Sequence, residues 1–390
     1  MRTFLESRAI PTAVIFTVVG VLPLYLTSAQ AVRLQQELSF GRTRFGIIVA
    51  CFYLLSIATL WLGPRVDRSG PTPAFRMAAL LSLASAALIA ATATRWELLA
   101  LYMAVAGLAN AYGQLGSNLA VAGAVRDTRH GVAFAAKQAA VPTGAMLAGL
   151  AIPWVGPAVS WRWAYAGAAA VALLIAVVTP HYEHTPQKAP RRAKFTAPLV
   201  TLMVAAALAG GAGNAIASFS VDAAVTTGFS QPTAARLLTA GSIVAIASRL
   251  GFGAIIDRRH SSGIVEATAL LTLATIGLLI LVAVGATPAA FVIGILLAFA
   301  GAWGWPGVMQ YVTIRTIDMP AATSTGATMA GGFFGSLALP PAFGAAADHL
   351  SYSVAFLGLV GSVVIALTAV HISRHIARVT QPHTWGAKRP

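Results

Sequence analysis

The stretch GPRVDRSG, residues 63–70, is a short charged turn that follows an apolar run. A related turn, GAIIDRRHSSG, begins at Gly253. Both turns read Gly, three residues, Asp-Arg and then a further Gly. Gly63 and Gly253 lie about half of the 390-residue chain apart. A charged turn that recurs half a chain away indicates an internal duplication.

The composition is that of a membrane protein. Hydrophobic residues make up 57% of the chain, charged residues 9%, and the mean hydropathy is +0.77, whereas soluble domains carry about 25% charged residues. The net charge of +15 is spread along the chain without a dense basic patch, so we expect no nucleic-acid partner and assign the excess to membrane orientation. With Cys51 as its single cysteine, the chain can form no internal disulfide, and we expect no metal site or cofactor.

Twelve apolar runs are each long enough to be a transmembrane helix, which needs about 20 residues. The first run is about twice as long as the core of a typical signal peptide, so we interpret it as a retained span. Helices are expected throughout, because lipid offers no partner to an open strand edge. The twelve candidates are residues 9–32, 44–62, 74–94, 97–122, 131–153, 161–180, 198–221, 234–256, 264–286, 289–312, 324–347 and 350–373.

The loop charges predict the orientation. If both termini are cytoplasmic, most of the 26 Lys and Arg residues lie in cytoplasmic segments, as the positive-inside rule requires. Arg42 and Arg44, in an outer loop, run against this pattern. The segment 181–197 is polar, basic and contains two prolines, so we interpret it as a cytoplasmic linker between residues 1–180 and 198–390.

The two Asp-Arg turns then fall after the second and the eighth span, and in this respect the chain resembles the major facilitator superfamily. Its loop motif runs Gly, three residues, Asp-Arg, one residue, Gly and a basic residue. The matching residues are Gly63, Asp67, Arg68 and Gly70, with Pro71 in place of the basic residue, and more loosely Gly253, Asp257 and Arg258. The resemblance implies an all-α integral membrane protein of twelve transmembrane helices in two six-helix bundles, which work by alternating access.

The resemblance also implies a conformational latch. Asp67 would contact the N-terminus of the eleventh span and Asp257 that of the fifth, where the helix dipole favours a carboxylate. These contacts would form when the cytoplasmic side is closed. The alternative is that both aspartates make ordinary surface salt bridges, which contribute less than about 1 kcal/mol.

Two basic residues lie inside predicted spans, where charge is costly and indicates function. They are Lys137 in the fifth span and Arg249 in the eighth. In one interpretation they bind an anionic substrate, since Arg presents a planar fork to a carboxylate, and residues 249–258 resemble the eighth span of monocarboxylate and oxalate–formate porters. In the other, Lys137 pairs with Asp257, and Arg249 reaches the cytoplasmic interface or backbone carbonyls. The first six spans carry no acid at depth; Asp222 approaches a span interior near the outer end of the seventh.

Neutral polar residues complete the candidate site. Asn110, Gln114 and Asn118 recur every fourth residue and therefore form one stripe on their helix. The stripe would either form hydrogen bonds between helices or line a cavity. Further candidates are Tyr25, Asn214, Trp303 and Gln310.

We therefore expect a monomeric secondary transporter in the bacterial inner membrane, surrounded by lipid. Its substrate would be a small organic anion, such as a monocarboxylate, moved with a proton or by exchange. The alternative is a broad-specificity exporter of apolar or drug-like compounds. An enzyme is not expected, because no constellation of catalytic residues falls at span depth.

Overall fold

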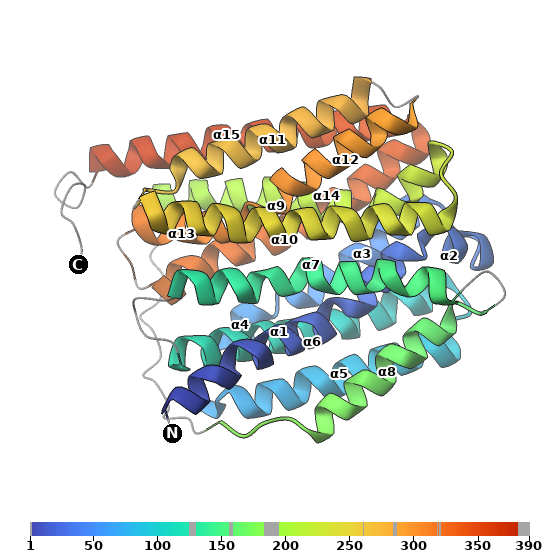
Figure 1. Ribbon diagram of the computed structural model, residues 1–390, viewed down its shortest axis with the longest axis horizontal. Helices are drawn as coiled ribbons and strands as arrows, with labels where there is room; N and C mark the ends of the chain where they lie inside the picture. Colours follow the sequence, from blue (N-terminus) through green and yellow to red (C-terminus); the bar gives the residue numbers. More distant parts are fainter. Residues whose placement is uncertain are drawn as a thin grey trace.

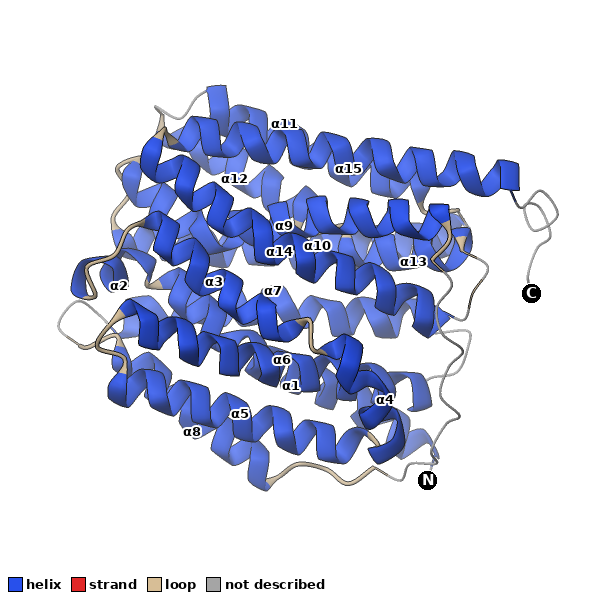
Figure 2. Ribbon diagram, turned by 180° about the vertical axis from the view of Figure 1, so that it is seen from behind, coloured by secondary structure: helices blue, strands red, loops and turns tan. Residues whose placement is uncertain are grey.

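The structure is a computed structural model that describes residues 2–124, 130–155, 159–182, 195–259, 261–283, 287–317, 319 and 321–380. All of the regular secondary structure in these residues is helical (Figure 2). The helices are α1 (Arg2–Ala29), α2 (Ala31–Glu37), α3 (Arg42–Ser56), α4 (Thr59–Ser69), α5 (Pro71–Thr92), α6 (Trp96–Ala124), α7 (His130–Val155), α8 (Arg162–Val177), α9 (Ala197–Thr226), α10 (Gln231–Arg259), α11 (Ile264–Ala283), α12 (Pro288–Ala302), α13 (Pro306–Thr316), α14 (Ala321–His349) and α15 (Tyr352–Thr380).

The long helices run side by side along one direction (Figure 1). In that view α1 and α5–α8 lie in the lower half and α9–α15 in the upper half, while the start of α1 and the end of α15 lie at the same end of the molecule. Two helix pairs join the halves, since α14 packs along α3 and α10 packs along α7. Most of the predicted linker, residues 183–194, lies outside the described residues.

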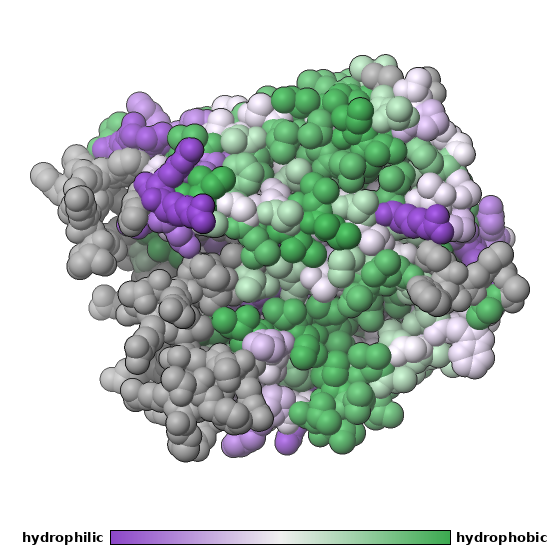
Figure 3. Space-filling view, viewed as in Figure 1, coloured by the Kyte–Doolittle hydropathy of each residue, from purple (hydrophilic) through white to green (hydrophobic). Residues whose placement is uncertain are grey.

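The outer surface is that of a protein in a bilayer. A wide apolar band crosses the middle of the molecule, and polar side chains gather toward the ends (Figure 3). Large apolar side chains face outward in both halves of the chain, among them Leu54, Leu101, Leu174, Ile293 and Ile365. In water such a surface would aggregate, so it indicates lipid as the solvent.

Eight segments of the described chain are long and apolar enough to cross a membrane, with α12 and α13 counted as one. The pair α2 and α3, bent by 114°, would be a ninth. The apolar α8 has 16 residues and is shorter than a full crossing needs. The chain is therefore a multi-pass helical membrane protein, and the count of twelve spans stays a prediction.

Two of the predicted spans are broken. Residues 44–62 divide into α3 and α4, because the turn at Ile57 and Ala58 tightens to bonds between residues three apart, such as Leu60 N to Ile57 O at 3.0 Å. Pro64 then has no N–H for the carbonyl of Leu60. Residues 289–312 divide into α12 and α13 at 303–305, where Gly304 and Pro306 interrupt the helix.

Both Asp-Arg turns end on a glycine with a positive φ angle. Gly70 has φ +88°, directly before α5, and Gly263 has φ +79°, directly before α11. Glycine adopts such angles without the steric cost that a side chain brings. The duplication read from these turns therefore has a structural counterpart, since each half reverses direction on a glycine in the same place.

Close approach of the two halves depends on small residues. A Cβ added to Gly46 in α3 would lie 2.5 Å from the carbonyl oxygen of Pro340 in α14. A Cβ added to Gly149 in α7 would lie 2.4 Å from the hydroxyl of Thr239 in α10. These contacts close the interface between the halves at the end of the molecule opposite the start of α1 (Figure 1).

Candidate substrate-binding site

A central cavity of about 140 Å³ lies between the two halves. Its lining residues come from α1, α3, α6 and α7 in the first half and from α9, α10, α12, α13 and α14 in the second, together with the break between α12 and α13. Most of the predicted binding residues line it, namely Tyr25, Asn110, Gln114, Asn214, Arg249, Trp303 and Gln310. Lys137 and Asn118 are not among the lining residues.

Arg249 joins α10 to α7 and to the break between α12 and α13 at this cavity. Its side chain is 5% exposed and belongs to α10. The Nε atom donates to the carbonyl oxygen of Trp303 at 2.6 Å, and Nη1 donates to the carbonyl oxygen of Gln138 in α7. The break at 303–305 makes the first bond available, because helical bonding is interrupted there and the Trp303 carbonyl faces the guanidinium. Arg249 therefore reaches backbone carbonyls, as one of the two interpretations expected.

Lys137 lies beside the cavity rather than in its wall. Its side chain is 1% exposed, and Nζ donates to Oε1 of Gln114 in α6. The backbone carbonyl of the next residue, Gln138, accepts a hydrogen bond from Arg249. Lys137 is therefore adjacent in α7 to the residue that Arg249 contacts. Asp257, the partner that the second interpretation gave Lys137, is exposed near the end of α10. The structure thus supplies Gln114 as the partner of Lys137.

The two bases are not neutralised by acids. None of the ion pairs among the described residues includes Lys137 or Arg249. Arg249 is also the one charged side chain among the described residues that line the cavity. Hydrogen bonds to carbonyl and amide oxygens offset part of the cost of burying these charges, but they carry no net negative charge. The cavity therefore carries a positive electrostatic potential.

The stripe in α6 contributes two residues to the cavity. Nε2 of Gln114 lies 3.4 Å from Oδ1 of Asn110, and Nδ2 of Asn110 donates to Ser56 in α3 at 3.1 Å. Both alternatives for the stripe therefore hold at these residues, which bond to other side chains and also line the cavity. Asn118, one turn further along α6, is half-buried and lies away from it.

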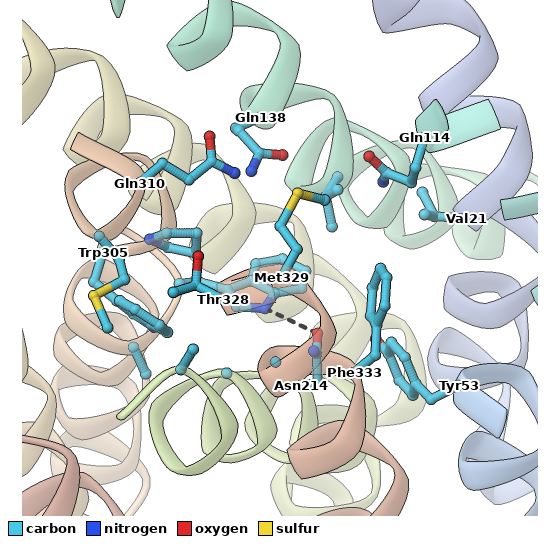
Figure 4. Close-up of a pocket in the computed structure, with 18 of the residues that line it drawn as sticks. Val21, Tyr53, Gln114, Gln138, Asn214, Trp305, Gln310, Thr328, Met329 and Phe333 are labelled. Carbon is cyan, nitrogen blue, oxygen red and sulfur yellow. Dashed lines mark hydrogen bonds between the residues drawn. The ribbon is translucent and has the colours of Figure 1, made fainter. Parts of the chain in front are cut away.

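A series of hydrogen-bonded side chains, formed by Trp303, Asn214 and Ser336, lies in the second half. Nε1 of Trp303 lies 3.4 Å from Oδ1 of Asn214, a contact marked in Figure 4, and Nδ2 of Asn214 donates to Ser336 at 2.7 Å. The ring of Trp303 meets that of Tyr25 edge-on, with centroids 5.4 Å apart. Tyr25 belongs to α1, so this contact also crosses between the halves.

Sequence reasoning missed several lining residues. Gln138, Tyr53, Thr328, Met329 and Phe333 line the cavity but were not predicted. Gln138 had a signal, since it is a polar residue next to the buried Lys137. No such signal existed for Tyr53, Met329 and Phe333. In the sequence of an apolar span, an aromatic residue or a methionine that faces the cavity cannot be distinguished from one that faces lipid or the core.

The residues of the predicted latch lie outside the cavity. Gly63 sits on α4 against Leu115 of α6, Gly70 ends α4, and Asp67 is half-buried. Gly253 lies on α10, and Arg68, Asp257 and Arg258 are exposed. Their predicted partners are the starts of α7 and α14. The side chains there fall outside the described residues, so the latch stays a prediction.

Comparison with known proteins agrees with this architecture. The chain is similar over its length to the crystal structure of a bacterial homolog of the human lysosomal transporter Spinster, in an inward-facing and unoccupied conformation, with a TM-score of 0.64, 13% identity and 96% of each chain covered. It is also similar to the crystal structure of the human organic anion transporter MFSD10 (TETRAN), with a TM-score of 0.69, 15% identity, and 94% of this chain and 99% of that one covered. At these identities the likeness shows the fold.

A search of curated protein sequences found no match. The sequence profile of the Major Facilitator Superfamily, in contrast, matches residues 12–329, which confirms the resemblance seen in the Asp-Arg turns. The chain therefore belongs to the Major Facilitator Superfamily and is a membrane transporter.

Proposed function

We propose that the protein is a secondary transporter of a small organic anion, such as a monocarboxylate. The observation that carries this proposal is the pair of buried bases, Lys137 and Arg249, at a cavity whose described lining includes no acidic side chain. A carboxylate in the cavity would meet a field of opposite sign, whereas a cation would be repelled.

Arg249 is the proposed contact for the substrate. Two of its donors are engaged by backbone carbonyls, which leaves Nη2 and the second hydrogen of Nη1 for a carboxylate. Lys137 does not line the cavity but donates a hydrogen bond to Gln114, which does. Its charge would strengthen the positive potential in the cavity. Asn110, Gln114, Asn214, Trp303, Gln310 and Tyr25 would complete the site as neutral contacts, with Asn118 the weakest candidate because it lies outside the wall.

In the proposed mechanism the chain forms twelve spans in two six-helix bundles, residues 1–180 and 198–390, joined by the linker 181–197. The bundles rock about the cavity and expose it to each side in turn. A gradient of protons or an exchanged anion would supply the energy. The proposed location is the inner membrane, with both termini cytoplasmic and the chain acting as a monomer. MFSD10, whose fold the chain shares, is described as an organic anion transporter, which is consistent with this substrate class.

Export of apolar or drug-like compounds is the second candidate function. The apolar part of the cavity wall favours it, because Val21, Phe52, Met309, Met329 and Phe333 all line the space. This candidate predicts that a neutral compound binds as well as an anion, since its binding would not depend on Arg249.

Binding of a carboxylate and of its neutral amide analogue separates the two candidates. Purified protein should bind the carboxylate more tightly. Arg249→Ala should abolish most of that preference, because removal of one partner from a desolvated charged contact typically costs about 2–5 kcal/mol. Arg249→Lys keeps the charge and loses the planar fork, so it should retain part of the preference.

Arg236→Ala is the matched control, because Arg236 lies on the same helix, α10, outside the cavity lining. Preference for the amide in the wild type, or an anion preference that survives Arg249→Ala, would contradict anion transport and favour the exporter. Uptake of the carboxylate into proteoliposomes, with and without a pH gradient, then tests proton coupling.

A further inference from the structure

We propose that the preferred anion is amphipathic, with one anionic head at Arg249 and an apolar body that packs against Phe52, Tyr53 and Phe333. This inference rests on the proposed function and names the substrate class of the same cavity. It follows from the way in which polar and apolar side chains are separated around the cavity wall.

The polar side of the wall is formed by amides. Figure 4 shows Gln114, Gln138 and Gln310 along one side of the cavity. The backbone carbonyl of Gln138 receives the bond from Arg249, and Oε1 of Gln114 receives the bond from Lys137, so this side also holds both bases. An anionic head is stabilised there by charge and by neutral donors together.

The apolar side of the wall is aromatic. Tyr53 and Phe333 lie together across the cavity from the amides (Figure 4), with ring centroids 6.3 Å apart and planes tilted by 32°. Phe52 meets Tyr53 edge-on, with centroids 5.2 Å apart. The three rings come from α3 and α14, so an apolar body held between them would contact both halves of the transporter.

The distribution of charge argues for a single head. Arg249 is the one charged side chain among the described lining residues, and Lys137 lies behind Gln114. A second carboxylate would face the aromatic rings and lose its hydration, and the described wall offers no second charged side chain to offset that cost. An ammonium group would find no carboxylate in the described wall. Dicarboxylates and amino acids are therefore poor fits.

The cavity wall also holds a donor that the protein leaves unpaired. Nε1 of Trp305 is buried and makes no hydrogen bond among the described residues, yet Trp305 lines the cavity. A buried donor without a partner costs free energy. An acceptor on the substrate, such as a carboxylate oxygen, would satisfy it.

Gly332 offers a way to fill the apolar side. It lines the cavity, and a Cβ added there would meet a single atom within 4 Å, the carbonyl oxygen of Ala206 at 3.8 Å. A leucine at this position would extend into the cavity without a backbone clash at its Cβ. Gly358 in α15 is a matched control, because it is exposed and an added Cβ meets nothing within 4 Å.

The test is calorimetric binding of acetate, butyrate, hexanoate, benzoate and succinate to the wild type, to Gly332→Leu and to Gly358→Leu. In the wild type we expect affinity to rise about fourfold for each added methylene from acetate to hexanoate, with benzoate tight and succinate weak. Gly332→Leu should remove the gain for hexanoate and benzoate and weaken acetate much less. Gly358→Leu should match the wild type.

A second variant guards against misfolding of the first. Phe333→Ala removes one ring of the wall and introduces no larger side chain, and it should weaken benzoate at least tenfold more than it weakens acetate. Equal affinities along the wild-type series, or succinate as tight as benzoate, would overturn the inference while leaving anion transport intact. If no carboxylate binds better than its amide, the proposed function itself fails.

Discussion

The carboxylate of Asp348, at the end of α14, accepts a hydrogen bond of 2.7 Å from the backbone N–H of Thr43, at the start of α3. The N–H of Arg42 and the hydroxyl of Thr43 donate to the same carboxylate at 3.1 and 2.8 Å. The N-cap residue of α3 is Gly41, which has no side chain to cap the helix. Asp348 thus supplies, from the other half of the chain, the acceptor that the helix lacks.

Arg42 extends this contact to α9. Its Nε donates to Oδ2 of Asp222 at 2.7 Å, and Tyr352 donates to the same oxygen. We call Arg42, Thr43, Asp222, Asp348 and Tyr352 the outer clamp. In the predicted orientation Arg42 runs against the positive-inside pattern, and its charge is there offset by two aspartates of the second half. The predicted cytoplasmic latch relies on the same chemistry, an aspartate at a helix N-terminus, at the opposite end.

We predict that Asp348→Asn weakens closure of the outer end. The amide keeps the size of the side chain but loses the negative charge that the start of α3 favours. The equilibrium should shift toward the outward-open state by about 1 kcal/mol, which is about fivefold. Labelling of a cysteine placed in the cavity, from the outside, measures the shift.

Arg33→Gln is the control for this experiment. Arg33 pairs with Glu37 at 2.8 Å within α2, so its loss leaves contacts between the halves unchanged. Equal labelling of Asp348→Asn and the wild type would show that the outer clamp does not set the conformation.

Outer closure should also depend on pH. Burial of the Asp348 carboxylate would raise its pKa, but hydrogen bonds from Thr43 and Arg42 and the charge of Arg42 outweigh burial and hold the pKa below its ordinary value. A lowered pKa means that the ionised form stabilises the closed state. That contribution is complete above the ordinary pKa of about 4 and is lost as the pH falls through the lowered value.

Labelling of the cavity cysteine from the outside, divided by that of a permanently exposed cysteine at the same pH because thiols lose reactivity in acid, should therefore rise in the wild type below about pH 4. Asp348→Asn, which cannot titrate at this position, should show a smaller dependence on pH. The same pH dependence in both proteins would assign the effect to other groups.

We predict that Asp67→Asn and Asp257→Asn weaken closure at the cytoplasmic end. If each aspartate contacts the start of a helix in the opposite half, its loss should shift the population toward the inward-open state by about 1–2 kcal/mol. Cysteine labelling from the cytoplasmic side reports the shift. Unchanged labelling in both variants would leave the two turns with a structural role only.

Gly70→Ala should lower the stability of the fold. Gly70 has φ +88° and ψ 176°, a region that is essentially restricted to glycine and costs a side chain about 1–3 kcal/mol. The thermal unfolding temperature of purified protein should fall, whereas that of Gly358→Ala, on the exposed face of α15, should not. A Gly70→Ala protein as stable as the wild type would mean that the turn can adopt another geometry.

Reporter fusions test the topology. A fusion after Lys194 and a fusion after Arg378 should both be cytoplasmic, because the basic residues of the chain concentrate in those segments. An external signal from either fusion would mean that the number of spans before it is odd.

Several properties of this protein follow from the sequence by itself. The length and polarity of the apolar runs are local properties, and the bilayer requires each run to form a helix. The Asp-Arg turns identify the family, and the glycines at their ends, Gly70 and Gly263, have the backbone angles that favour glycine. Lys137 and Arg249 were identifiable because charge inside a span is rare and costly.

Other properties were decided by the tertiary structure. The break at Gly304 and Pro306 turns a Trp303 carbonyl toward Arg249, and Gln138 meets the same guanidinium from the other half. Which aromatic residues face the cavity, and that Asp348 caps α3, depend on how helices distant in sequence pack together. An apolar side chain is compatible with lipid, with the protein core and with the cavity wall alike. Which of these surroundings it has depends on how the two halves pack together.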